Sequence, residues 1–177
     1  MDAWFGPFLI ACLLLGAAGF AKAVDPTMTV GALRAMGRRI PNVAVRLAGG
    51  VEAVLALAAV LTGDPVLALL VAVSYACFTL FVVVALVRRV PIGSCGCFGK
   101  VDTPPSISHL VVNVGAALTA IAVAAGGNRG IGSVLADQPL GGIPFLVLGV
   151  VGTYAAFTAL TVVPALARVG TSRGSRS

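Results

Sequence analysis

Residues 65–87 read PVLALLVAVSYACFTLFVVVALV, and none of these side chains is charged. A segment of about 20 mostly apolar residues is long enough to cross the hydrocarbon core of a bilayer as an α-helix. Backbone N–H and C=O groups inside lipid must be paired within the segment itself, so a continuous apolar run of this kind is expected to be helical. The segment therefore predicts a transmembrane helix.

Four further segments have the same character, and they are expected at residues 3–23, 42–62, 106–126 and 143–167. The composition agrees, because 59% of the 177 residues are hydrophobic and only 10% are charged. A soluble domain usually carries about 25% charged residues. The sequence thus predicts an all-α polytopic membrane bundle of five helices, with lipid as its main surroundings.

We expect the chain to divide into three parts. Residues 1–126 hold the first four helices and the connection 88–105, residues 127–169 hold a loop and the fifth helix, and residues 170–177 form a disordered basic tail. The first apolar segment has no basic residue before it and is longer than the apolar run of a typical signal peptide. It is therefore expected to be retained as a helix.

Lysine and arginine residues gather in the connections on one side of the predicted membrane. They are Lys22, Arg34, Arg38 and Arg39 after the first helix, Arg88, Arg89 and Lys100 after the third, and Arg168, Arg173 and Arg176 in the tail. The opposite connections carry only Asp64, Arg129 and Asp137. The positive-inside rule then predicts an N-terminus outside and a cytoplasmic C-terminus, with the 88–105 connection in the cytoplasm. Short basic clusters beside apolar runs are typical of lipid head-group anchors, so the net charge of +6 does not indicate nucleic acid as a partner.

Ionisable residues inside a membrane span are candidates for function because burying them in lipid is costly. Glu52 lies roughly 13 Å into the second predicted helix, and Lys22 and Arg46 lie near the same membrane face as possible partners. The pattern allows a buried ion pair that fixes helix packing, or a group that accepts protons or tunes a nearby thiol. Lys22 alone is also typical of a basic side chain that reaches the membrane surface.

His109 and Asn113 lie four residues apart in the fourth predicted helix and so share one face. Ser106 is a plausible N-cap of that helix. His109 is then a polar residue at the membrane surface, and Asn113 forms a hydrogen bond between helices. Alternatively, both residues support the chemistry of Cys95 and Cys97.

The four cysteines form two groups. Cys12 and Cys77 lie in the middle of apolar segments, where we expect buried and unreactive thiols. Cys95 and Cys97 lie in the glycine-rich stretch PIGSCGCFGK at residues 91–100. A disulfide across a single glycine closes a small, strained ring, and strained exposed disulfides are easily reduced.

Nearby cations favour the thiolate form of Cys95 and Cys97, and Arg89 and Lys100 flank this pair. The pattern therefore favours a redox-active dithiol. Two alternatives remain open: a structural loop, or a metal site formed by Cys95, Cys97 and His109. The cysteine spacing differs from that of usual zinc sites, so the metal site stays an alternative to the favoured dithiol. No cofactor is expected.

Several of these residues together resemble the MauE family of bacterial methylamine-utilisation membrane proteins, within the wider DoxX-like group. The resemblance covers residues 1–126 and is carried by Gly19-x-x-Lys22, Asp25-Pro26, Val51-Glu52, the Cys-Gly-Cys-Phe-Gly run Cys95–Gly99, and His109-x-x-x-Asn113. It implies a four-helix core in the bacterial plasma membrane that assists maturation of methylamine dehydrogenase, or a redox-associated protein outside that pathway. It also implies Cys95 and Cys97 as the working pair, with supporting roles for Lys22, Glu52, His109, Asn113 and Lys100.

We therefore predict a membrane redox accessory protein that exchanges disulfides with an unidentified thiol or disulfide partner protein. The alternative is a non-catalytic assembly component or a transport component for a small solute or metal. No nucleotide motif or catalytic triad indicates a stand-alone small-molecule enzyme. Oxidation of exported proteins takes place outside the membrane, whereas the charge distribution puts the cysteines inside, and the sequence leaves this conflict open.

The fifth predicted helix lies outside the resemblance. It carries Gly149, Gly152 and Ala156, small residues at a spacing typical of close helix packing in membranes. The pattern predicts a helix contact within the chain or between chains, and hence a possible homo-oligomer through this helix.

Overall fold

The computed structural model describes residues 4–90, 104–126 and 130–162. The described chain is helical, with no strand among these residues. Cys95, Cys97, Lys100 and the predicted basic tail lie outside the described residues.

Within the described residues, five helices are long and apolar enough to cross a membrane, as the sequence predicted. They are α1 (Phe5–Val24), α3 (Asn42–Thr62), α4 (Pro65–Val87), α5 (Ile107–Gly126) and α7 (Ile143–Thr161), the last continuing from the 3₁₀ turn η2 (Pro139–Gly142). The all-α polytopic membrane fold is thereby confirmed.

Two short helices were not predicted, α2 (Thr27–Ala35) and α6 (Ile131–Ala136). The start of α2 is fixed by Asp25, whose carboxylate accepts hydrogen bonds from the backbone N–H and the hydroxyl of Thr27. Gly37, with φ of +81°, lies just beyond its end. A helix of this length has too few apolar positions for its periodicity to stand out in the sequence.

The turn between α3 and α4 explains why these helices form an antiparallel pair. Gly63 ends α3 in the left-handed conformation, which glycine adopts without steric cost. Asp64 then caps α4, because its carboxylate accepts hydrogen bonds from the N–H groups of Val66 and Leu67 at 2.8 and 3.1 Å. Pro65 follows at the first helical position, where its missing N–H costs nothing.

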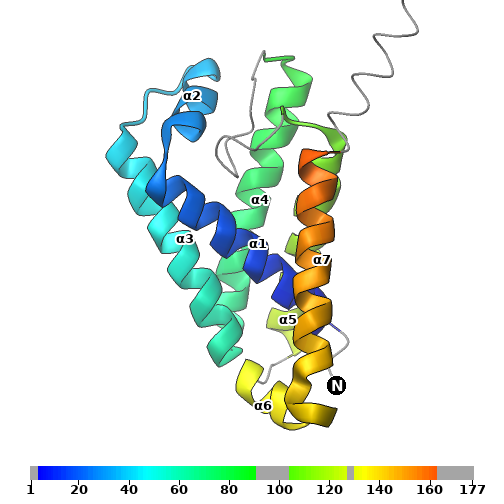
Figure 1. Ribbon diagram of the computed structural model, residues 1–177. Helices are drawn as coiled ribbons and strands as arrows, with labels where there is room; N and C mark the ends of the chain where they lie inside the picture. The colour runs from blue at the N-terminus through cyan, green and yellow to red at the C-terminus, as the bar shows by residue number, and fades with distance from the viewer. Residues whose placement is uncertain (1–3, 91–103, 127–129, 163–177) are drawn as a thin grey trace, which may run out of the picture.

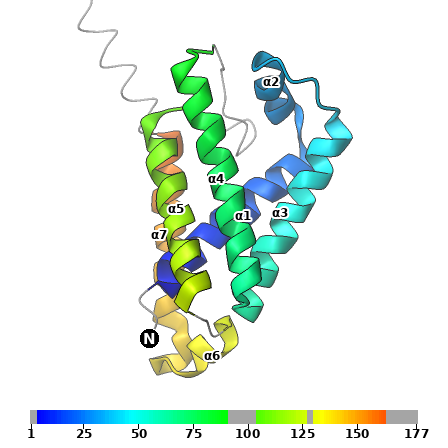
Figure 2. The same ribbon diagram turned by 180° about the vertical axis from the view of Figure 1, so that it is seen from behind.

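Helix α1 is the centre of the bundle. It runs diagonally across the other helices (Figures 1 and 2) and packs on α3, α5 and α7, while α4 packs mainly on α5. Many of its apolar side chains, Phe8 and Leu15 among them, are almost completely buried in one core cluster with Val71 of α4 and Ala120 of α5. Helices α3 and α4 separate toward the end of the bundle where α2 lies, as both views show.

The outer faces of the helices are apolar. On α3 the exposed large apolar side chains are Val43, Leu47, Val51, Val54, Leu57 and Leu61. A continuous apolar face of this size is not tolerated in water by a monomeric soluble protein. The chain is therefore a multi-pass membrane protein, with these faces toward lipid.

The glycines of the fifth helix pack against α1 of the same chain. A Cβ atom at Gly149 would lie 2.9 Å from Cδ2 of Leu9, and one at Gly152 would meet the side chain of Ile10, so both glycines face α1. Association between copies of the chain through α7 stays a prediction, and it would use another face of this helix, where Tyr154 is 70% exposed.

Candidate functional site

Lys22 and Glu52 form an ion pair between α1 and α3. Lys22 lies in the last turn of α1 and is only 5% exposed, and its ammonium contacts the carboxylate of Glu52. Of the two partners that the sequence left open, the structure selects Lys22, because Arg46 instead donates a hydrogen bond of 2.9 Å to the carbonyl of Val24. A buried charge in lipid needs such a partner to avoid the full cost of desolvation.

Two glycines make this pair possible. A Cβ atom at Gly19 would lie 2.6 Å from the carbonyl oxygen of Gly49, and one at Gly49 would lie 2.6 Å from the carbonyl oxygen of Gly19, so the two backbones touch. The added atom at Gly49 would also lie 2.8 Å from Cβ of Lys22, and the one at Gly19 would lie 3.1 Å from Cβ of Glu52. Each glycine thus lies opposite the charged residue of the other helix and leaves room for its side chain.

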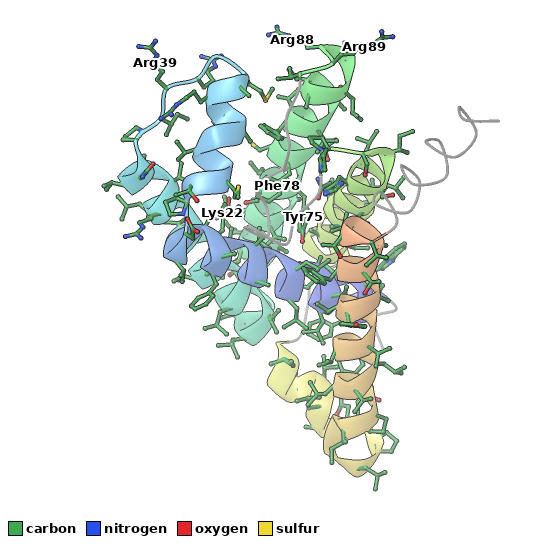
Figure 3. All side chains as sticks on the ribbon, turned by 45° about the horizontal axis from the view of Figure 1, so that its top comes forward. Lys22, Arg39, Tyr75, Phe78, Arg88 and Arg89 are labelled. Atoms are coloured by element: carbon green, nitrogen blue, oxygen red, sulfur yellow. The ribbon has the colours of Figure 1, made fainter. Side chains whose placement is uncertain are left out.

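Phe78 of α4 lies next to this ion pair. The Lys22 ammonium is 4.5 Å from the centre of the Phe78 ring, within the range of a cation–π interaction. Phe78 makes an edge-to-face contact with Tyr75, at 6.0 Å between ring centres. The hydroxyl of Tyr75 donates a 2.6 Å hydrogen bond to the carbonyl of Ala11, which ties α4 to α1 (Figure 3).

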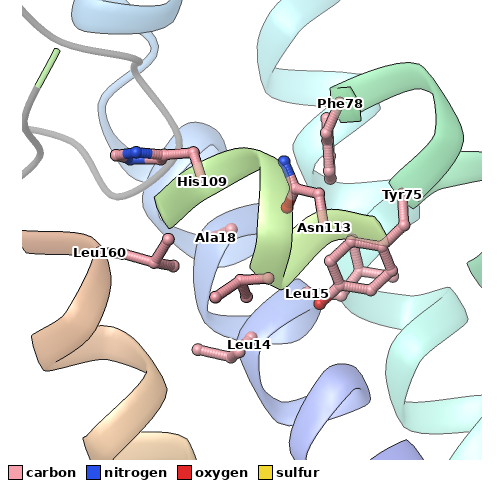
Figure 4. Close-up of a pocket in the computed structure, with 9 residues that line it drawn as sticks. Leu14, Leu15, Ala18, Tyr75, Phe78, His109, Asn113 and Leu160 are labelled. Atoms are coloured by element: carbon pink, nitrogen blue, oxygen red, sulfur yellow. The ribbon is translucent and has the colours of Figure 1, made fainter. Parts of the chain in front are cut away.

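His109 and Asn113 of α5 are both buried. Together with Phe78, Tyr75 and apolar residues of α1, they line a cavity of about 20 Å³ (Figure 4), large enough for about one water molecule. Nδ1 of His109 is 2.9 Å from the hydroxyl of Ser106, the predicted N-cap of this helix. In Figure 4 Asn113 lies next to Phe78, whereas the His109 ring points away from it.

A larger cavity of about 450 Å³ lies between α1, α2, α3 and α4. The ion pair of Lys22 and Glu52 forms part of its wall, and most of the remaining lining is apolar. Cys77 also lines it and is exposed, so the prediction that this thiol is buried was wrong. The reason is the separation of α3 from α4, which leaves this face of α4 uncovered, while Cys12 is buried in the core as predicted.

The polar residues and the basic residues lie toward one end of the bundle. This end holds the last turn of α1, the first turn of α5 with His109, and the arginines Arg39, Arg88 and Arg89 that Figure 3 labels. The described chain breaks off after Val90, at the end of α4, and resumes at Pro104, just before α5. The segment that carries the two cysteines is therefore attached to the bundle at this end.

The roles of Cys95, Cys97 and Lys100 stay predictions, since these residues lie outside the described part of the chain. Within that part, no three His, Cys, Asp or Glu side chains lie close enough to share a metal ion. The alternative site of Cys95, Cys97 and His109 includes two undescribed residues, and it stays a hypothesis.

The sequence did not indicate Phe78, Tyr75, Gly49 or the cavities. One signal was present: Gly49 precedes Glu52 by three residues, as Gly19 precedes Lys22. When two antiparallel helices pair Lys22 with Glu52, this equal spacing brings Gly19 opposite Glu52 and Gly49 opposite Lys22. The contacts of the glycines with the charged side chains could therefore have been predicted from the pair. For Phe78 and Tyr75 there was no comparable signal, because aromatic residues are common in apolar spans.

Comparison with known proteins supports the resemblance carried by the sequence motifs. The sequence model of the family described as "Methylamine utilisation protein MauE" matches residues 2–126, which include all four helices α1, α3, α4 and α5 and exclude α7. Searches of curated proteins and of solved structures gave no match. The wider DoxX-like grouping stays a prediction. Because the match covers well over half of the chain, this multi-pass membrane protein belongs to the MauE family.

Proposed function

We propose that this protein is a membrane accessory protein for thiol–disulfide exchange, in which Cys95 and Cys97 exchange electrons with the thiols of a partner protein. The observation that carries the proposal is that the buried ion pair of Lys22 and Glu52, and His109 in the first turn of α5, lie toward the end of the bundle from which the cysteine segment departs. Charged and polar residues are costly inside a membrane and are typical of functional sites there.

In the proposed reaction, the thiolate of Cys95 or Cys97 attacks one sulfur of a disulfide in the partner. A disulfide forms between the two proteins, and the other sulfur of the partner leaves as a thiolate. The second cysteine then attacks the mixed disulfide and releases the partner as a dithiol, with Cys95 and Cys97 joined. The partner gains two electrons and two protons, and the reverse sequence converts a partner dithiol to a disulfide.

The remaining residues support this chemistry. His109 and Lys100 favour the thiolate, as a proton acceptor and as a nearby cation. Glu52 and Lys22 hold α1 on α3, and Asn113 places an amide in the membrane beside Phe78. The name of the family points to methylamine utilisation, so the proposed partner is a disulfide-containing protein of that metabolism.

The proposed location is the bacterial plasma membrane, with the N-terminus outside and the C-terminus in the cytoplasm. Arg38, Arg39, Arg88 and Arg89 flank the membrane at the end of the cysteine segment, whereas Asp64 and Asp137 lie in the connections at the other end. This asymmetry supports a cytoplasmic cysteine segment.

The test is to trap the mixed disulfide in cells. In a Cys12→Ala, Cys77→Ala background, we expect Cys95→Ser or Cys97→Ser to accumulate a partner adduct that disappears on reduction, because the resolving thiol is missing. The double variant Cys95→Ser, Cys97→Ser should insert normally and give no adduct. Absence of an adduct from both single variants would contradict thiol exchange and favour a non-catalytic assembly or transport role.

The same background tests the orientation. A membrane-impermeant thiol reagent should label Cys95 and Cys97 only after the membrane is opened. Labelling in intact cells after reduction alone would put the pair outside and overturn the proposed orientation, while leaving thiol exchange intact.

A further inference from the structure

The cavity between α1, α2, α3 and α4 has the size of a ligand site. Its volume of about 450 Å³ falls within the ~300–1,000 Å³ typical of small-molecule pockets. It lies where α3 and α4 separate, and three of the helices that line it, α1, α3 and α4, cross the membrane. A ligand for this cavity is therefore expected to be lipid-soluble.

The described residues of the lining are mostly apolar. Leu33 of α2, Val45 of α3 and Phe81 of α4 are among the apolar residues, and Thr29 is polar but uncharged. Among these described residues, the charged ones are Lys22 and Glu52, which neutralise each other. An ionised ligand would add an unpaired charge to this membrane-buried site, so a neutral molecule fits better.

The ion pair offers both kinds of hydrogen-bonding group. An ammonium carries three N–H donors, and a carboxylate has several acceptor positions, so both retain capacity when they are paired. Lys22 can donate to a carbonyl oxygen, and Glu52 can accept from a hydroxyl group at nearly the same place. Phe78 and Phe81 add aromatic surface to the same wall. A flat neutral ring that bears carbonyl groups in one redox state and hydroxyl groups in the other matches all of these features.

We propose that this cavity binds the ring of a lipid-soluble quinone, with a ring oxygen at Lys22 and Glu52 and the tail directed to lipid. The redox role of this ligand rests on the function proposed above. When Cys95 and Cys97 have oxidised a partner, they are left as a dithiol. Transfer of two electrons and two protons to the quinone re-forms the disulfide and yields the quinol.

Cys77 allows a binding test that does not depend on that redox role, because this exposed thiol lies in the cavity wall. The probe is a decyl-substituted benzoquinone whose ring is fully substituted, so that thiols cannot add to it. The protein is the full chain with Cys12→Ala, Cys95→Ser and Cys97→Ser in lipid vesicles, and the readout is the rate of Cys77 alkylation by N-ethylmaleimide. With the quinone at about ten times its dissociation constant, we expect alkylation to slow about tenfold, because only the unoccupied fraction reacts.

Two controls make the result specific. Val54→Cys, in a chain without the other cysteines, puts a thiol on α3 at a position that is 68% exposed and outside the cavity lining, and its alkylation should be unaffected. The double variant Lys22→Met, Glu52→Gln removes both charges together. It should keep the basal alkylation rate of Cys77 and lose the protection.

Three results would overturn the proposal: no protection of Cys77, equal protection in the double variant, or equal protection by decylbenzene, which lacks the ring oxygens. The last would show that the cavity takes only an apolar chain. Since the test protein has no Cys95–Cys97 pair, none of these results bears on the mixed-disulfide experiment, and the two proposals can fail separately.

Discussion

Helix α1 crosses two other helices at glycines, and the two crossings differ in what the glycines face. At the crossing with α3, Gly19 and Gly49 face each other's backbone, and a Cβ atom added to either would lie 2.6 Å from the opposing carbonyl oxygen. At the crossing with α7, Gly149 faces the end of the Leu9 side chain. A backbone cannot move without shifting a helix, whereas a side chain can change its rotamer.

The two crossings also differ in polarity, and only the first lies entirely within the residues that match the MauE family. The α1–α3 crossing holds the buried ion pair of Lys22 and Glu52 and lies within residues 2–126, which match MauE. The α1–α7 crossing is apolar at its glycines and involves a helix outside that match. We infer that the first crossing has one permitted geometry, set by two glycines and an ion pair, and that the second can adjust.

The largest effect is expected when one charge of the ion pair is removed. Lys22→Met leaves the Glu52 carboxylate buried without its partner, which should lower the free energy of unfolding by about 3–5 kcal/mol. Unfolding by SDS in detergent micelles, followed by circular dichroism, would measure this. The double variant Lys22→Met, Glu52→Gln should recover most of the loss, because no unpaired charge remains.

If Lys22→Met were as stable as the parent, Glu52 would not depend on Lys22, and the ion pair would not be what fixes this crossing. If the double variant were as unstable as the single one, the loss would come from packing of the Lys22 side chain on Phe78 instead.

A smaller loss is expected when the two backbones are forced apart. In Gly49→Ala the new methyl group would lie 2.6 Å from the carbonyl oxygen of Gly19 and 2.9 Å from the backbone nitrogen of Ala23. Overpacking of this kind costs about 1–3 kcal/mol. The matched control is Gly50→Ala on the same helix, where a Cβ atom meets nothing within 4 Å.

The control Gly50→Ala should be neutral or more stable, since alanine favours a helix over glycine by about 0.5–1 kcal/mol. Equal stability of Gly49→Ala and Gly50→Ala in the same SDS titration would show that the helices can separate without cost. The α1–α3 crossing would then be as adjustable as the crossing with α7.

The sequence predicted the parts of the fold that follow from local composition. An uninterrupted apolar run such as residues 65–87 has one stable form in lipid, so all five spans could be located from hydropathy and charge alone. The candidate partners of Glu52 were also limited to two, because Lys22 and Arg46 are the lysine and arginine residues that lie inside the predicted spans. Helix α2 was missed because its few apolar positions form no clear stripe, and because its start is held by hydrogen bonds from Thr27 to the Asp25 carboxylate, which periodicity does not reveal.

Contacts between helices were harder to predict, because they depend on the rotation and tilt of each helix. Residues on every side of α4 are apolar, so its sequence does not indicate which face contacts α1 and which lines the cavity. This is why Cys77 was expected to be buried like Cys12, and why the contact of Phe78 with Lys22 was not recognised. The choice of Lys22 over Arg46 likewise depends on the glycine contact that brings α1 onto α3.

The smallest effect is expected at the crossing with the fifth helix. In Gly149→Ala the methyl group would lie 2.9 Å from Cδ2 of Leu9, a terminal atom of a flexible side chain. A strained rotamer of Leu9 costs about 0.5–1.5 kcal/mol, and the gain in helix propensity offsets about 0.5–1 kcal/mol of it. We therefore expect the free energy of unfolding to change by less than about 1 kcal/mol relative to the parent. Relative to Gly115→Ala, which gains the same helix propensity and whose added methyl group meets nothing within 4 Å, the loss should equal the rotamer cost of about 0.5–1.5 kcal/mol. A loss as large as that of Gly49→Ala in the same SDS titration would mean that Leu9 cannot move. Helix α7 would then be as firmly fitted to α1 as α3 is, despite lying outside the residues that match the family.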